Sequence, residues 1–213
     1  MKIVNASVVH VDAITRLIMT AMTDDCCRNL AGPRHSLDDF RRVMRSLVMM
    51  DCSQYSYLNA MVALDDEAEG FDAAVCDISH APVAGVIVGY DGGELHRLRR
   101  KFQEAALQHF QMDYTNMDDE TRAGEFYIDS LAVEPAYRRR GIAKGLLAAM
   151  TERARSLGLP AALLVDKGNP SAERLYRSVG FRYVGDAVWG GHEMRRMLCD
   201  GEGGSVSDTT ALP

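Results

Sequence analysis

Residues 133–150, with the sequence VEPAYRRRGIAKGLLAAM, are the most informative part of the chain. They follow an apolar run, turn at Glu134-Pro135, and bring three arginines and a glycine to the start of a predicted helix. Four apolar residues then recur at helical spacing on one face, namely Ile142, Leu146, Leu147 and Met150. The segment therefore predicts a strand, a turn and an amphipathic helix in succession.

The turn before this helix predicts an anion-binding site. A helix that starts after a strand presents free backbone N–H groups and the positive end of its dipole, which suits a phosphate or pyrophosphate. Gly141 lets the backbone approach the anion without a Cβ, and the arginines and Lys144 add positive charge. The alternative is a basic helix N-terminus that binds nothing. Basic residues there oppose the dipole, so this alternative is less economical.

Two blocks of sequence resemble the GNAT superfamily of N-acetyltransferases. Residues 138–143, RRRGIA, fit the family signature Arg/Gln-x-x-Gly-x-Gly/Ala, and they follow the strand-like run FYIDSLAV at 126–133. Residues 169–181, NPSAERLYRSVGF, are similar to the family pattern Asn-x-x-Ala-x-x-Leu-Tyr-x-x-x-Gly-Phe. The first block is weak by itself, whereas two blocks in the right order and at the right separation are specific. The resemblance covers residues 126–184 and is loose before them.

The resemblance implies both a fold and a reaction. The fold is α/β, a mixed and mostly antiparallel sheet of about seven strands with helices on both faces. A splay is expected between two central parallel strands, 126–133 and 161–165. The implied enzyme is an acyltransferase that uses acetyl-CoA as its donor. Where the strands part, backbone polar groups lose their partners, and the amides of the pantetheine arm can replace them.

The cofactor-binding residues implied by the resemblance come from the strand, the turn and the second block. The Leu131 N–H is expected to bind the thioester oxygen and to stabilise the oxyanion that forms on attack. Asn169 is expected to cap a helix that has Pro170 in its first position, and to contact the pantetheine arm. The complete set is Leu131, Ala132, Val133, Arg138, Arg139, Arg140, Gly141, Ile142, Ala143, Lys144, Asn169 and Tyr176.

Tyr176 is the predicted general acid. Its phenol is a proton donor at neutral pH, the departing CoA thiolate needs a proton, and the family has a tyrosine at this position for that purpose. The alternative is an amphipathic tyrosine that packs on its helix with the hydroxyl at the rim.

The general base has two candidates, Glu125 and Asp129. An amine acceptor is mostly protonated at pH 7 and must lose a proton before it attacks. Both acids fall on the central strand, where residues 125, 127, 129, 131 and 133 share one nominal face. A strand bulge could change which acid faces the cleft. Either acid could instead pair with a base or attract a cationic substrate.

Composition disfavours nucleic acid as a partner, although a local basic patch remains possible. Of the 213 residues 47% are apolar and 25% are charged, and the net charge is −6, whereas nucleic-acid binders usually have a basic excess. No run is long enough to span a membrane and the N-terminus lacks a signal-peptide pattern, so a cytoplasmic protein is expected.

Five cysteines without a Cys-x-x-Cys pair predict reduced thiols. The histidines show no metal-ligand spacing, so no metal is expected.

Length favours one domain over residues 1–200, with a loose polar tail at 201–213. Residues 94–120 are predicted to form a helix and an acidic stretch, longer than most connections. This segment either covers the acceptor cleft or makes an oligomer contact, as in a homodimer. Elsewhere, helices are predicted near 14–22 and 36–47, a loop at 24–33, strands at 2–6 and 55–64, and hairpins at 73–78 with 83–90 and at 181–188 with 192–198.

Three functions remain open. The first is N-acetylation of a small-molecule or peptide primary amine. The second is protein N-terminal or lysine acetylation, although residues 165–169, VDKGN, depart from the pattern usual in ribosomal-protein acetylases. The third is a non-catalytic acetyl-CoA-binding regulatory module, which would have no need of the acid predicted at Tyr176. The sequence does not name the acceptor.

Overall fold

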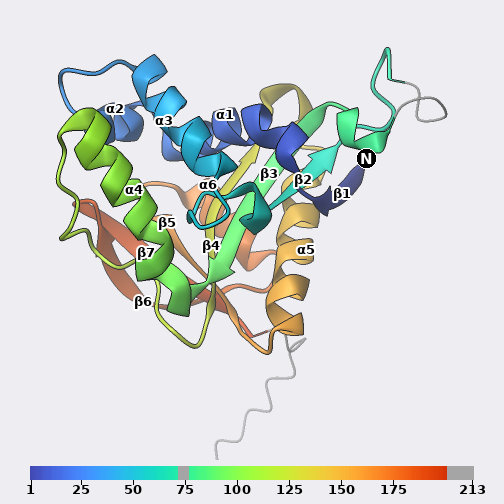
Figure 1. Ribbon diagram of the computed structural model, residues 1–213. Helices are drawn as coiled ribbons and strands as arrows, with labels where there is room; N and C mark the ends of the chain where they lie inside the picture. Colours follow the sequence, from blue (N-terminus) through green and yellow to red (C-terminus); the bar gives the residue numbers. More distant parts are fainter. Residues whose placement is uncertain (72–76, 201–213) are drawn as a thin grey trace, which may run out of the picture.

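The computed structural model describes residues 1–71 and 77–200 (Figure 1). The predicted tail at 201–213 and most of the strand predicted at 73–78 lie outside the described residues. Within the described residues, seven strands form one sheet in the order β1-β2-β3-β4-β5-β7-β6. Every neighbouring pair is antiparallel except β4 and β5, which are parallel. The predicted mixed sheet is therefore confirmed.

The elements follow one another along the chain as strands separated by helices. The strands are β1 (Lys2–Asn5), β2 (Ala60–Leu64), β3 (Val83–Asp91), β4 (Phe126–Val133), β5 (Ala161–Asp166), β6 (Arg182–Trp189) and β7 (His192–Cys199). The helices are α1 (Val11–Met22), α2 (Asp24–Ala31), α3 (Leu37–Met49), α4 (Leu95–Phe110), α5 (Ile142–Ser156) and α6 (Pro170–Arg177).

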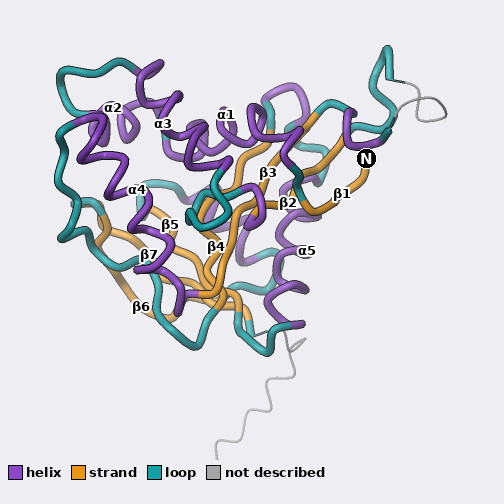
Figure 2. Tube along the Cα trace, viewed as in Figure 1, coloured by secondary structure: helices purple, strands orange, loops and turns teal. Residues whose placement is uncertain are grey.

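The two larger of the three apolar clusters in the described residues cover opposite faces of the sheet. One lies beneath α1 to α4 and includes Ile14, Phe40 and Phe102. The other lies beneath α5 and includes Phe126 and Leu146. Figures 1 and 2 show α1 to α4 on one side of the central strands and α5 on the other. The expected helices on both faces are confirmed.

Strand β4 carries a bulge at Asp129. In the pairing with β3, Ser130 lies opposite Val88 and Ile128 opposite Gly89, so Asp129 is the extra residue. The bulge shifts the alternation of side chains by one position. Leu131 and Val133 consequently pack on the α5 side together with Phe126 and Ile128. The prediction that Leu131 and Val133 share a strand face with Tyr127 was therefore wrong.

The two parallel strands part after a short contact. β4 pairs with β5 only at Phe126 with Ala161 and at Tyr127 with Ala162. Beyond this point β4 remains paired with β3, and β5 continues along β7 to Asp166. The expected splay is therefore present, and it opens toward the carboxyl ends of both strands.

Three local predictions were wrong. Residues Asp24–Ala31 form helix α2 and not a loop, because the Thr23 side chain accepts a hydrogen bond from the Cys26 N–H at 3.4 Å and two acids occupy the first turn. The strand predicted from residue 55 starts only at Ala60. The pairing predicted for strand 83–90 was also wrong, whereas most of its expected partner at 73–78 lies outside the described residues. β3 has β2 and β4 as its neighbours, and Ile78–His80 is a 3₁₀ turn.

Candidate active site

The arginine-glycine turn leads directly into α5. Gly141 adopts a left-handed conformation with φ of 81°, Arg139 has φ of 65°, and no side chain caps the helix. The Gly145 N–H donates to the Gly141 carbonyl at 3.1 Å, so the N–H groups of residues 142–144 are the orphan donors of the helix N-terminus. Four exposed cations surround these donors, namely Arg138, Arg139, Arg140 and Lys144. The turn thus has the donors and the charge to bind a phosphate.

Of the three residues predicted on β4, Leu131 and Val133 present backbone polar groups to the splay and Ala132 does not. The Glu134 N–H donates to the Ala84 carbonyl of β3 at 2.9 Å. Because the polar groups of a strand point alternately to its two sides, those of Val133 and Leu131 face away from β3, whereas those of Ala132 face β3. The Val133 carbonyl also accepts a hydrogen bond from Arg138 Nε at 3.1 Å, which links the turn to the strand.

Helix α6 brings Tyr176 to the other side of the splay. Asn169 caps the helix by accepting a hydrogen bond from the Ala172 N–H at 3.0 Å, and Pro170 occupies its first turn. The Tyr176 ring packs edge-on against Phe181 at 6.0 Å between centroids. Burial raises the pKa of Tyr176 to about 12, so the phenol keeps its proton at neutral pH. Its hydroxyl has no hydrogen-bond partner among residues 1–71 and 77–200.

Asp129 lies on the opposite side of β4 from α5, among residues of the α1-to-α4 side. Burial, followed by the charge of Glu120, raises its pKa to about 7, while hydrogen bonds from Ser130 and Gln54 and the charge of Arg99 act in the opposite direction. The Ser130 hydroxyl donates to the carboxylate at 2.8 Å. Asp129 nevertheless remains partly exposed. A carboxyl that is partly ionised at neutral pH is suited to removing a proton from a substrate.

Three buried tyrosines surround this carboxyl. They are Tyr55 from the loop before β2, Tyr90 from β3 and Tyr127 from β4. The rings of Tyr90 and Tyr127 lie 5.8 Å apart, edge to face. Burial first, and then the charges of Asp129 and Glu120, raise the pKa of each tyrosine well above 10. All three therefore stay neutral at any pH at which Asp129 titrates.

Glu125, the other candidate base, is already paired. It is only 3% exposed and forms an ion pair with Arg196. Its carboxylate also accepts hydrogen bonds from the Thr121 hydroxyl at 2.6 Å and from the Arg122 N–H at 3.2 Å. These contacts hold the chain that enters β4.

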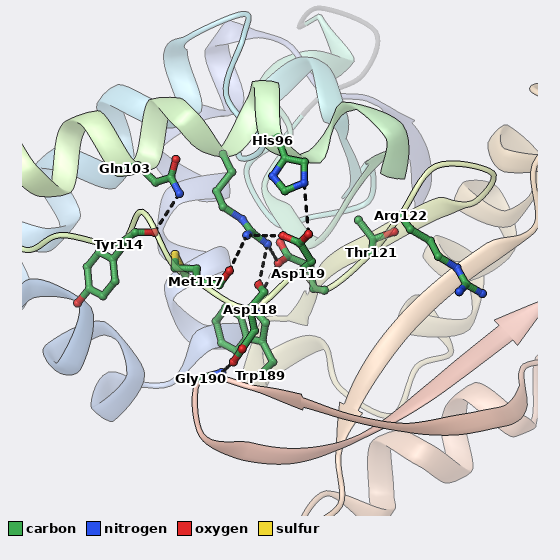
Figure 3. Close-up of polar contacts among 12 residues, drawn as sticks. His96, Gln103, Tyr114, Met117, Asp118, Asp119, Thr121, Arg122, Trp189 and Gly190 are labelled. Atoms are coloured by element: carbon green, nitrogen blue, oxygen red, sulfur yellow. Dashed lines mark hydrogen bonds and ion pairs between the residues drawn. The ribbon is translucent and has the colours of Figure 1, made fainter.

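The segment after α4 is held against the site by a buried arginine. Arg99 of α4 forms an ion pair with Glu120 and donates to the Asp118 carbonyl at 2.9 Å. Glu120 in turn accepts hydrogen bonds from the Tyr90 hydroxyl at 3.1 Å and from Trp189 Nε1 at 3.3 Å. Figure 3 shows residues 117–119 between α4 and the turn that joins β6 to β7. The segment 94–120 therefore forms one wall on the Asp129 side of β4.

Sequence motifs missed four residues of this site, namely Gln54, Tyr55, Tyr90 and Glu120. They come from three separate segments, and no spacing connects them. Within residues 1–71 and 77–200, no group of three or more His, Cys, Asp or Glu side chains is arranged to hold a metal ion. In the same part of the chain, no helix has both the length and the apolar character needed to cross a bilayer.

The chain was compared with known families, proteins and structures. The sequence model of the acetyltransferase (GNAT) family matches residues 50–181. The [Ribosomal protein bS18]-alanine N-acetyltransferase of Haemophilus ducreyi is 32% identical over 85 residues, which are 36% of this chain and 59% of that protein. The match thus spans less than two thirds of the length of this curated relative.

Solved acetyltransferase structures share the fold. One crystal structure of an acetyltransferase has a TM-score of 0.73 and 25% identity, and covers 95% of this chain and 100% of its own. The N-acetyltransferase from Staphylococcus aureus Mu50 has a TM-score of 0.70 and 22% identity, with 93% and 100% covered. The NatC complex bound to Gag peptide and CoA has a TM-score of 0.52 and 17% identity, with 93% and 98% covered. Because the family match extends over more than half of the residues and the fold agrees with it, the chain belongs to the GNAT family of acetyltransferases.

Proposed function

We propose that this protein transfers the acetyl group of acetyl-CoA to a primary amine, with Asp129 as general base and Tyr176 as general acid. The observation that carries the proposal is Asp129 itself. A carboxyl with a pKa of about 7 lies on a strand bulge where β4 leaves β5. Proton acceptors work best when their pKa lies near the operating pH.

The fold supplies groups that fit the donor. The backbone of Leu131 and Val133 faces the splay, where the amides of a pantetheine arm would find partners. The N–H groups at the start of α5 and the four cations beside them fit a pyrophosphate. Asn169 lies at the start of α6, which follows β5, the strand on the other side of the splay from β4. We therefore expect the strand, the turn and the helix cap to bind different parts of the same donor molecule.

The proposed reaction gives each of these groups one role. Asp129 removes a proton from the acceptor ammonium, which frees the nitrogen lone pair to attack the thioester carbonyl carbon. The Leu131 N–H stabilises the negative charge that develops on the thioester oxygen. The new C–N bond forms as the C–S bond breaks, Tyr176 donates its proton to the departing sulfur, and the acylated nitrogen releases its second proton to solvent or back to Tyr176. The products are an N-acetyl amine and CoA.

A second candidate is acetylation of a protein amine. The Haemophilus ducreyi relative is named for acting on an alanine of ribosomal protein bS18. An α-amino group is also a primary amine, so the same base and acid would serve. The two candidates differ only in what lies beyond the reacting nitrogen.

One experiment tests the function and separates the two candidates. Release of free CoA is measured with a panel of small primary amines and of peptides with free N-termini, and mass spectrometry identifies the acetylated product. We expect amine-dependent release that is saturable in the acceptor. A higher kcat/KM for peptides would favour the protein acceptor. CoA release at the same rate with and without amine would contradict the proposal.

A further inference from the structure

The loop between α3 and β2 places a buried glutamine beside Asp129. Gln54 is only 4% exposed. Its side-chain amide lies close enough to the Asp129 carboxyl to lower the pKa of that carboxyl. The amide oxygen, Oε1, is buried and has no hydrogen-bond partner within the described residues. Because the nitrogen and the oxygen share one planar amide group, Oε1 also lies next to the carboxyl.

The loop does not need this side chain for its own structure. Asn59 Nδ2 donates to the carbonyls of Ser53 at 3.0 Å and Gln54 at 3.3 Å. The Ser56 N–H donates to the Ser53 carbonyl at 3.1 Å, and the Tyr55 N–H to the Ser53 hydroxyl at 3.1 Å. The backbone of Gln54 is thus fixed by its neighbours without a contact from its own side chain.

A buried amide oxygen without a donor is unfavourable and calls for an explanation. No group of the described residues donates to it. Glu120 is paired with Arg99, and the Tyr90 hydroxyl already donates to Glu120. Asp129 makes no ion pair within the described residues, so it is the carboxylate left to meet a cation. An ammonium group brings several N–H donors and a positive charge, which matches one carboxylate and one adjacent carbonyl.

We infer that Gln54 Oε1 accepts a hydrogen bond from the nitrogen of the acceptor and, together with Asp129, positions a cationic primary amine for attack. The inference rests on the proposed function and names the residue that holds its acceptor. Asp129 takes one proton from the ammonium, and Gln54 keeps a second N–H pointed away from the thioester. The lone pair that the departing proton leaves behind is then directed toward the carbonyl carbon.

Gln54→Met tests the inference, because methionine is similar in length and shape but cannot accept the bond. We expect the acceptor KM to rise on the order of tenfold, as for the loss of one hydrogen bond to a charged group. Acetyl-CoA affinity, measured by calorimetry, should stay unchanged. The rising limb of kcat/KM against pH should move to higher pH, because Asp129 loses a donor that favours its ionised form.

Two further variants sharpen the result. Gln54→Glu retains an oxygen acceptor at the same distance from the backbone, so it should recover most of the acceptor KM. In Gln54→Glu the rising limb of kcat/KM against pH should still lie at higher pH than in the wild type, because a second carboxyl disfavours the ionisation of Asp129. Gln108→Met makes the same change at an exposed position of α4 and should alter neither quantity. If Gln54→Met does not fold, Gln54→Asn, which withdraws the oxygen by one methylene, should show the same rise in KM.

The possible outcomes distinguish the inference from the function on which it rests. A wild-type acceptor KM and pH limb in folded Gln54→Met would overturn the inference and leave the acetyltransferase activity in place. An equal loss of acceptor and acetyl-CoA affinity, with a lower Tm, would show a packing role and would also overturn it. A wild-type protein that binds acetyl-CoA but acetylates no amine in the panel would overturn the proposed function itself.

Discussion

At the scale of single residues, the acidity of Asp129 depends on one extra residue in a strand. The bulge lets β4 present Leu131 and Val133 to the α5 side while Asp129 lies among Gln54, Glu120 and Arg99. A carboxyl in these surroundings is a poor contributor to stability and a good proton acceptor at neutral pH.

We expect Asp129→Asn to lower kcat on the order of 10² to 10⁴-fold, the usual contribution of a general base. In the wild type, kcat/KM for the acceptor should rise with pH through about 7, where the raised pKa of Asp129 lies. The variant should lack this limb. The matched change Glu125→Gln breaks a buried ion pair, so it should lower Tm and leave the limb in place. A limb that disappears in Glu125→Gln and persists in Asp129→Asn would reverse the assignment.

The same substitution should stabilise the fold in a pH-dependent way. The pKa of Asp129 rises from 3.8 to about 7 on folding, so the folded protein binds more protons between these values and loses stability as pH increases through them. Asp129→Asn removes this loss. We expect its Tm to exceed that of the wild type at pH 8 and to approach the wild-type value at pH 4. For a domain of this size, about 1 kcal/mol corresponds to about 2–4 °C. An equal Tm difference at both pH values would contradict the prediction.

Tyr176→Phe removes only a hydroxyl from the packed ring. A thiolate is already a fair leaving group, since the pKa of a thiol is only about 8.5. We therefore expect kcat to fall by roughly 10² or somewhat less, the low end for a general acid, with little change in acetyl-CoA affinity. Tyr183→Phe, which removes an exposed hydroxyl from β6, is the control. Wild-type kcat in a chemistry-limited assay would remove Tyr176 from the mechanism, whereas a joint loss of affinity and rate would make it a positioning residue.

At the scale of elements, the N-terminus of α5 and the open edge of β4 meet at one point. The hydrogen bond from Arg138 Nε to the Val133 carbonyl fixes the turn to the strand. Because the turn and the strand are fixed relative to each other, a ligand that binds the turn through a phosphate and the strand through amides would have only one position along β4. This arrangement requires both the splay and a left-handed residue immediately before the helix.

We expect Gly141→Asp to abolish acetyl-CoA binding in calorimetry while circular dichroism shows a folded protein. The new carboxylate would stand at the anion site and repel a pyrophosphate. Gly158→Asp is the control, because Gly158 also has a left-handed φ, of 71° against 81°, and a Cβ would meet no atom within 4 Å at either position. Gly158 follows the other end of α5. Unchanged affinity in Gly141→Asp would refute the anion site, and equal losses in both variants would point to backbone strain.

At the scale of the whole molecule, the segment 94–120 connects distant parts of the fold. Through Arg99 and Glu120 it joins α4 to β3 and to the turn between β6 and β7. The sequence left open whether this segment covers the acceptor side or makes an oligomer contact. Its contacts favour the first, and a homodimer remains a prediction.

We expect Arg99→Met to raise the acceptor KM and to destabilise the fold by about 3–5 kcal/mol, because Glu120 would remain as an unpaired buried charge. Acetyl-CoA affinity and the sedimentation mass should not change. Arg97→Met, at an exposed position of the same helix, is the control. A changed sedimentation mass with an unchanged acceptor KM would instead identify the segment as an oligomer contact.

The local features of this protein could be predicted from the sequence. The cap at Asn169 and the turn before α5 depend on groups within a few residues of one another, and their spacing is visible in the chain. The parallel strands and their splay were expected because two motif blocks resemble a family in which both occur. Helix α2 was missed because its short, polar sequence resembles a loop.

The set of residues around Asp129 was decided only by the tertiary structure. The bulge at Asp129 is a matter of register between β3 and β4, and although the sequence allowed for a bulge, it did not show at which residue the alternation shifts. Gln54, Tyr90 and Glu120 converge because β3, α4 and the loop before β2 pack on the same face of β4. The pKa of a carboxyl depends on burial and on charges from such distant segments, and neither is encoded in its own neighbours along the chain.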